Sequence, residues 1–79
     1  MRYFFDVIDT GGKTQDVEGQ VLNGFDAMRL EAKRALAEIV SEEAFPADDL
    51  SLSLRVRDET NVEVYNLCLQ VKGSRPSNI

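Results

Sequence analysis

The residues from Leu50 to Arg57 alternate between aliphatic and polar side chains without exception. The aliphatic positions are Leu50, Leu52, Leu54 and Val56, and the polar positions are Ser51, Ser53, Arg55 and Arg57. Because successive side chains of a strand point to opposite faces, this pattern is typical of a strand with one buried and one wet face. The buried face needs another layer of structure to cover it.

That cover is supplied by the segment from Phe25 to Val40, where apolar residues recur at helical spacing without glycine or proline. On a helical wheel the following residues share one sector: Phe25, Met28, Ala32, Ala35, Leu36 and Ile39. Pro46 is expected to end the helix, and Phe45 beside it to fold back onto the core. We therefore predict one amphipathic helix that packs on the sheet.

Residues 2–8 are rich in aromatic and β-branched side chains, which favours a first strand. Its odd-numbered residues are expected to face inward, because the even-numbered face carries Asp6, a costly group to bury. The turn residues of Asp9–Thr14 predict a reversal of the chain, and a second strand is expected around Glu18–Leu22. These two strands form the first predicted hairpin.

A second hairpin is predicted after the turn residues 58–61. The apolar side chains that share one face of its second strand are Tyr65, Leu67, Leu69 and Val71. Antiparallel partners have a constant sum of residue numbers, and here inward even-numbered residues must face inward odd-numbered ones, so the sum is odd. The connection is therefore expected to have an even number of residues, either Glu59–Thr60 or 58–61.

Together these segments predict one α+β domain over residues 1–72, followed by a flexible tail over 73–79. The sheet is expected to be antiparallel and four-stranded, with two β-hairpins in ββαββ order and the helix packed on one face. A chain of 79 residues has no material for a second core.

The composition disfavours several classes of function. A formal net charge of −5 would repel a phosphate backbone, so the composition disfavours nucleic acid as a partner. No apolar run is long enough to cross a membrane, and the first residues do not resemble a signal peptide, so a cytoplasmic protein without membrane contact is expected. The chain has no histidine, the commonest general base and metal ligand, so we expect neither an enzyme nor a cofactor.

One alternative is a carboxylate-based metal or ligand site in the first hairpin. The acidic residues that would supply it are Asp6, Asp9, Asp16 and Glu18. Carboxylate oxygens are suitable ligands for a divalent cation, although this spacing is not that of a known calcium loop.

The preferred candidate surface is the sheet face turned away from the helix. Its apolar members are Phe4, Ile8, Val62, Val64 and Cys68, and Arg55 and Arg57 form a basic strip on the same face. If the two hairpins are adjacent, this patch predicts a homodimer formed sheet to sheet or edge to edge. If they are not adjacent, the same residues are scattered harmlessly over the surface.

Four short segments of the chain resemble a family of short proteobacterial proteins known as a domain of unknown function. They are Arg2-Tyr3-Phe4-Phe5-Asp6-Val7 followed by Asp9, Asp16-Val17-Glu18-Gly19, the alanine-rich helix through Ala32 and Ala35, and Val56-Arg57-Asp58-Glu59. The resemblance implies a ββαββ domain with no known activity or site.

The first half also resembles HicB-type antitoxin half-domains, in which a hairpin that opens with Met1-Arg2-Tyr3 precedes a helix. Here Gln20-Val21-Leu22-Asn23 replaces the Pro-Gly-Cys segment of those domains. This second resemblance implies binding to a small basic toxin. We expect a non-catalytic protein-interaction or regulatory domain whose partner is itself or another protein, with toxin binding and a metal site as alternatives.

Overall fold

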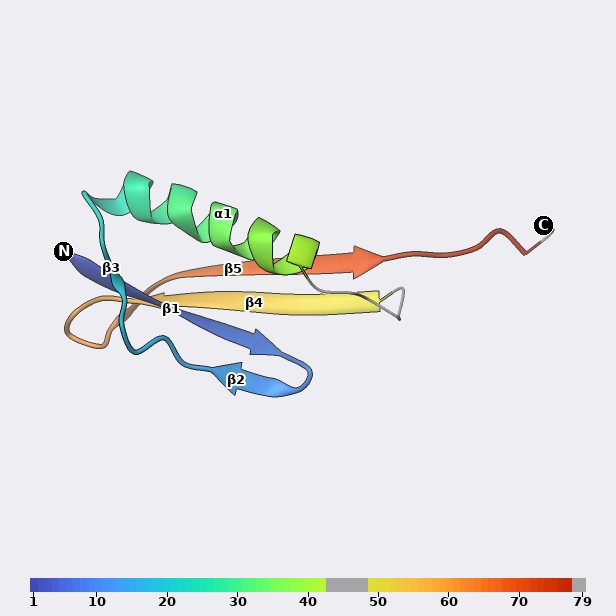
Figure 1. Cartoon of the computed structure of the whole chain (residues 1–79), viewed down its shortest axis with the longest axis horizontal. Helices are drawn as coiled ribbons and strands as arrows, with labels where there is room; N and C mark the ends of the chain where they lie inside the picture. Colours follow the sequence, from blue (N-terminus) through green and yellow to red (C-terminus); the bar gives the residue numbers. More distant parts are fainter. Residues whose placement is uncertain (43–48, 78–79) are drawn as a thin grey trace.

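The computed structural model describes residues 1–42 and 49–77. Its elements are β1 (Arg2–Asp9), β2 (Gly12–Thr14), β3 (Gln20–Val21), α1 (Phe25–Glu42), β4 (Asp49–Arg57) and β5 (Glu63–Lys72). The antiparallel sheet has the order β2-β1-β4-β5, and β3 also pairs with β1. Figure 1 shows α1 running along β4 and β5, on the side away from β2. The α+β class is confirmed, whereas the predicted helix end at Phe45 and Pro46 lies outside the described residues.

The second strand predicted around Glu18–Leu22 contains β3, which pairs antiparallel with β1 as expected. The strand β2 is additional and lies in the segment predicted as a turn, so the sheet in the described residues has five strands instead of four. From Val7 to Tyr3, β1 advances by four residues, whereas the returning chain advances by six, from Thr14 to Gln20. The two extra residues bow out of the sheet in residues 15–19, called here the 15–19 loop. The first turn was predicted over Asp9–Thr14, which is too long, because β2 pairs with β1 inside this segment.

The second hairpin, β4 and β5, has the predicted odd sum over most of its length. Leu54 faces Leu67, for example, so the apolar side chains of both strands share one face. The connection, however, has an odd number of residues, 58–62. The pairing of β4 with β5 shifts by one residue next to this connection. Val64 is the extra residue of this bulge, which restores the predicted sum for the rest of the hairpin.

The core lies between α1 and one face of β1, β4 and β5. Its buried members are Tyr3, Phe5, Met28, Ala32, Leu36, Leu52, Leu54 and Val56. These residues belong to the faces that the two periodicities predict. Phe25 was also predicted inside, but it is 50% exposed and meets Tyr65 edge to face at 5.9 Å between ring centroids. It lies at the rim of the core, where α1 begins.

Candidate functional site

The structure does not gather the predicted apolar patch into one surface, because β4 lies between β1 and β5. On the face away from α1, Ser53 is the cross-strand neighbour of both Ile8 and Cys68. Arg57 is in turn the neighbour of Phe4. The polar side chains of β4 therefore divide the patch.

The remaining members of the predicted patch also lie apart. Val64 packs against the core from its bulge, and Val62 is 54% exposed in the turn before β5. The Arg57 guanidinium lies over the ring of Phe4, 4.9 Å from its centroid, and covers part of it. Among residues 1–42 and 49–77, this face of the sheet therefore has no continuous apolar surface that a sheet-to-sheet dimer would bury.

Arg55 and Arg57, predicted as one basic strip, have different environments. Arg55 is exposed, with its Nε 3.5 Å from the carboxylate of Glu63. Arg57 reaches diagonally across to β1, where its Nε donates to Asp6 Oδ2 at 2.7 Å and its Nη2 to Asp6 Oδ1 at 3.0 Å. Its side chain is only 17% exposed. Arg57 therefore anchors the sheet, whereas Arg55 is a surface charge.

Asp6 lies on the predicted face, but it is buried, with 1% of its surface exposed. The bidentate pairing with Arg57 and a hydrogen bond from the backbone N–H of Asp16 compensate its burial. The Arg57 hydrogen bonds hold the pKa of the Asp6 carboxyl below its ordinary value of 3.8, against the opposing effect of desolvation. Asp6 is thus charged inside the fold at neutral pH.

Asp16 organises the 15–19 loop around the same pair. Its Oδ2 accepts the N–H of Phe5 at 3.0 Å, a bond that a neighbouring strand would otherwise supply. Its Oδ1 accepts the N–H groups of Glu18 and Gly19, both at 3.1 Å. Arg57 Nη2 donates to the carbonyl of Asp16 at 2.9 Å. Asp6, Asp16 and Arg57, called here the Arg57 cluster, join the loop to β1 and β4.

The carboxylates of the metal alternative are largely used in these internal bonds. The Asp9 carboxylate likewise accepts the N–H of Gly11 at 2.8 Å. Within residues 1–42 and 49–77, no group of three or more metal-ligating side chains is placed to hold an ion. The Arg57 cluster is therefore structural in its contacts, and sequence reasoning missed it because it depends on the pairing of β1 with β4.

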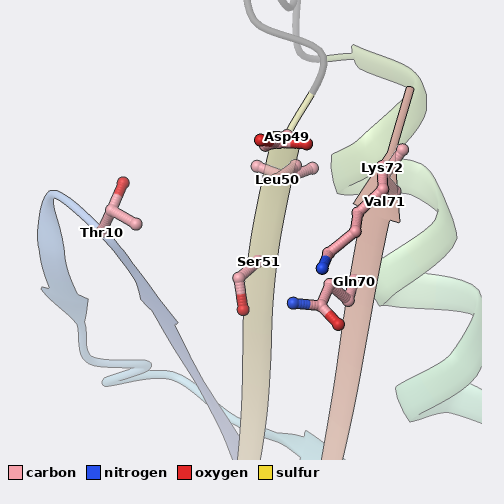
Figure 2. Close-up of a pocket in the computed structure, with 7 residues that line it drawn as sticks. All are labelled: Thr10, Asp49, Leu50, Ser51, Gln70, Val71 and Lys72. Atoms are coloured by element: carbon pink, nitrogen blue, oxygen red, sulfur yellow. The ribbon is translucent and has the colours of Figure 1, made fainter. Parts of the chain in front are cut away.

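An open hollow of about 220 Å³ lies where β4 begins and β5 ends, and Figure 2 shows the side chains that line it. Thr10 in the hairpin between β1 and β2 lies on one side, with Gln70 and Lys72 on the other. Asp49 and Ser51 of β4 lie between them. This mixture of ordinary polar groups offers no nucleophile with an activating base.

A second hollow, about 240 Å³, follows the outer edge of β5. It is lined from α1 by Lys33, Leu36 and Ala37, and from β5 by Leu67, Cys68 and Leu69. Consecutive strand residues point to opposite faces, so a hollow that touches three in a row meets the strand from its edge. We call it the β5 groove.

A family described as a domain of unknown function (DUF6894) matches residues 2–70, which include all of α1 and nearly all of the sheet. The chain belongs to this family. No curated protein and no solved structure matches the chain. Membership confirms an uncharacterised domain, whereas the proteobacterial origin and the HicB resemblance stay predictions.

The Arg57 cluster and the β5 groove both lie within the part of the chain that matches DUF6894. In the described part of this DUF6894 domain, no helix is long and apolar enough to cross a membrane. The family description carries no activity, so the functional assignment depends on these two features.

The Arg57 cluster predicts how stability of the DUF6894 domain depends on pH. Because folding lowers the pKa of Asp6, the ion pair stabilises the fold above the ordinary pKa of 3.8 and is lost as pH falls through the lowered value. The free energy of unfolding of the wild type is expected to decrease as the pH falls below about 4. Urea denaturation at a series of pH values measures it.

The variant Asp6→Asn cannot titrate at this position, so its free energy of unfolding is expected to change less over the same acidic range. Asp9→Asn, at an exposed position in the same strand, is the control and should keep the wild-type dependence. If the free energy of unfolding falls equally with pH in the wild type and in Asp6→Asn, Asp6 is not the cause of the pH dependence.

Proposed function

We propose that this domain is a non-catalytic protein-interaction module that works as a homodimer, and that it associates through the outer edge of β5. In the described part of the chain, β5 pairs with β4 alone. Its eight residues between Glu63 and Lys72, Val-Tyr-Asn-Leu-Cys-Leu-Gln-Val, include no charge, glycine or proline. This uncharged edge is the observation that carries the proposal.

An edge strand offers a row of unpaired backbone N–H and C=O groups to any other strand. Monomeric proteins usually protect such edges with lysines, prolines, bulges or very short strands. Here the bulge at Val64 protects one end only, and β5 is one of the longest strands in the sheet. Such an edge favours association by strand addition.

The β5 groove supports the same edge as a binding surface. Leu67 and Leu69 are only partly buried, although they belong to the apolar face of the sheet. Ala37, a small exposed residue, leaves room beside them. An added strand would gain backbone hydrogen bonds from β5 and apolar contacts from the groove.

A second copy of this chain is the favoured occupant. The two ends of β5 carry opposite charges, Glu63 and Lys72, so the edge is complementary to itself when two copies run antiparallel. The absence of histidine from the sequence and the internal bonds of the Arg57 cluster support a role without catalysis.

The test is to place a charge in the groove without disturbing the core. Ala37→Lys changes an exposed helix position, and lysine is a good helix former, so the variant is expected to fold. Two such lysines would face each other beside Lys33 in the dimer. We therefore expect the dissociation constant of the dimer to rise at least about tenfold. Light scattering coupled to size exclusion measures the mass over a concentration series.

Leu30→Lys is the matched control, because it introduces the same charge on α1 at a residue that is 71% exposed and outside the groove. The wild type and Leu30→Lys should have twice the chain mass of 8.9 kDa, whereas Ala37→Lys should shift towards the monomer. A wild-type protein that stays monomeric at high micromolar concentration would overturn the proposal. If Ala37→Lys and Leu30→Lys dimerise equally well, the β5 groove is not part of the dimer interface.

A further inference from the structure

Resting on the proposed homodimer, we infer that two copies pair β5 to β5 in antiparallel orientation, about a two-fold axis perpendicular to the sheet, and that each copy completes the groove of the other. The two sheets then join into one continuous sheet. Both α1 helices lie on the same face of it, because rotation about this axis does not exchange the faces.

The alternation of side chains restricts the register. Odd-numbered residues of β5 such as Leu67 face the helix layer, so they must meet odd-numbered residues of the partner. The two most central registers place Leu67 opposite the partner's Leu67 or the partner's Leu69. In each of them the half-buried leucines of one groove cover those of the other, which is the contact that the isolated chain lacks.

Charge distinguishes the antiparallel from the parallel arrangement. Glu63 faces away from the helix layer, as its contact with Arg55 at 3.5 Å shows, and Lys72 shares this face by alternation. Antiparallel pairing places Glu63 within one residue of the partner's Lys72. Parallel pairing in the same alignment would instead bring the two Glu63 side chains together and the two Lys72 side chains together.

Cys68 reports on this geometry, because it is the only cysteine of the chain, is exposed and lies near the middle of β5. In both central registers it faces the partner's Cys68 directly or diagonally, at about 5–8 Å. Two Glu63 side chains, by contrast, would lie about 30 Å apart along the paired strands. A short bis-maleimide reagent links thiols at the first separation and not at the second.

The experiment compares the wild type with Glu63→Cys and Lys72→Cys, each in the Cys68→Ser background. The wild type is expected to give a covalent dimer as the major product on a denaturing gel. Glu63→Cys and Lys72→Cys are expected to stay uncrosslinked alone and to crosslink when mixed. Circular dichroism verifies folding of each variant, and the same reaction in urea gives the collisional background.

Two outcomes would overturn the antiparallel pairing while the proposed function survives. In the first, the protein forms a dimer that Ala37→Lys weakens, but Cys68 does not crosslink. In the second, the protein forms such a dimer, but Glu63→Cys crosslinks to itself. A wild type that is monomeric in solution and gives only background crosslinking would overturn both. Crosslinking of Cys68 together with the mixed pair supports the antiparallel dimer.

Discussion

Replacing Arg57 with methionine is expected to destabilise the fold by about 3–5 kcal/mol, because Asp6 would stay buried without its cation. Methionine keeps much of the aliphatic length of the side chain but cannot donate to Asp6 or to the Asp16 carbonyl. Small domains have only about 5–15 kcal/mol of stability in total. A large part of the margin of this protein therefore depends on one side chain.

Urea denaturation followed by circular dichroism measures this loss, and Arg55→Met is the matched control. Arg55 lies two residues away on the same face of β4, but its ion pair with Glu63 is solvent-exposed, so its loss should cost less than about 1 kcal/mol. Arg57→Met should also regain stability relative to the wild type in acid, where Asp6 becomes neutral. Equal losses in both variants would mean that burial of Asp6 does not matter.

The Arg57 cluster also shows which parts of the structure local sequence patterns can predict. The alternation from Leu50 to Val56 and the helical spacing after Phe25 predict β4 and α1, because each pattern is complete within one element. Asp6 and Arg57 are far apart in the chain, and their contact depends on the pairing of β1 with β4. Nothing in either segment alone specifies that neighbour.

The first hairpin was predicted only in part, for a related reason: the strand expected around Glu18–Leu22 contains β3 and pairs with β1, but β2 and the interruption at the 15–19 loop were missed. An uninterrupted second strand is the simplest partner for β1, but the Asp16 carboxylate occupies the N–H of Phe5 and interrupts the backbone pairing there. An aspartate among turn residues has many ordinary roles, so its sequence position does not reveal this one. The β5 edge was likewise not singled out, because alternation predicts a strand without saying which strands lie beside it.

Gly19→Ala is expected to destabilise the fold by about 2–5 kcal/mol, because the 15–19 loop has no room for a side chain at this position. Gly19 has a φ of +71°, which alanine adopts only at a cost. An added Cβ would lie 2.8 Å from the carbonyl oxygen of Tyr3 and 2.9 Å from Cε1 of Phe4. The backbone oxygen cannot move without disturbing the pairing of β1 with β3.

Gly11→Ala is the control for this substitution. It adds the same methyl group in the adjacent hairpin, where the nearest atom is Oδ1 of Asp9 at 3.3 Å, and it should change stability by less than about 0.5 kcal/mol. Gly19 also donates its N–H to Asp16, so Gly19→Ala and Arg57→Met disturb the same loop. Their combination should cost less than the sum of the two losses. Strict additivity in urea denaturation would contradict the view that the loop and the Arg57 cluster form one unit.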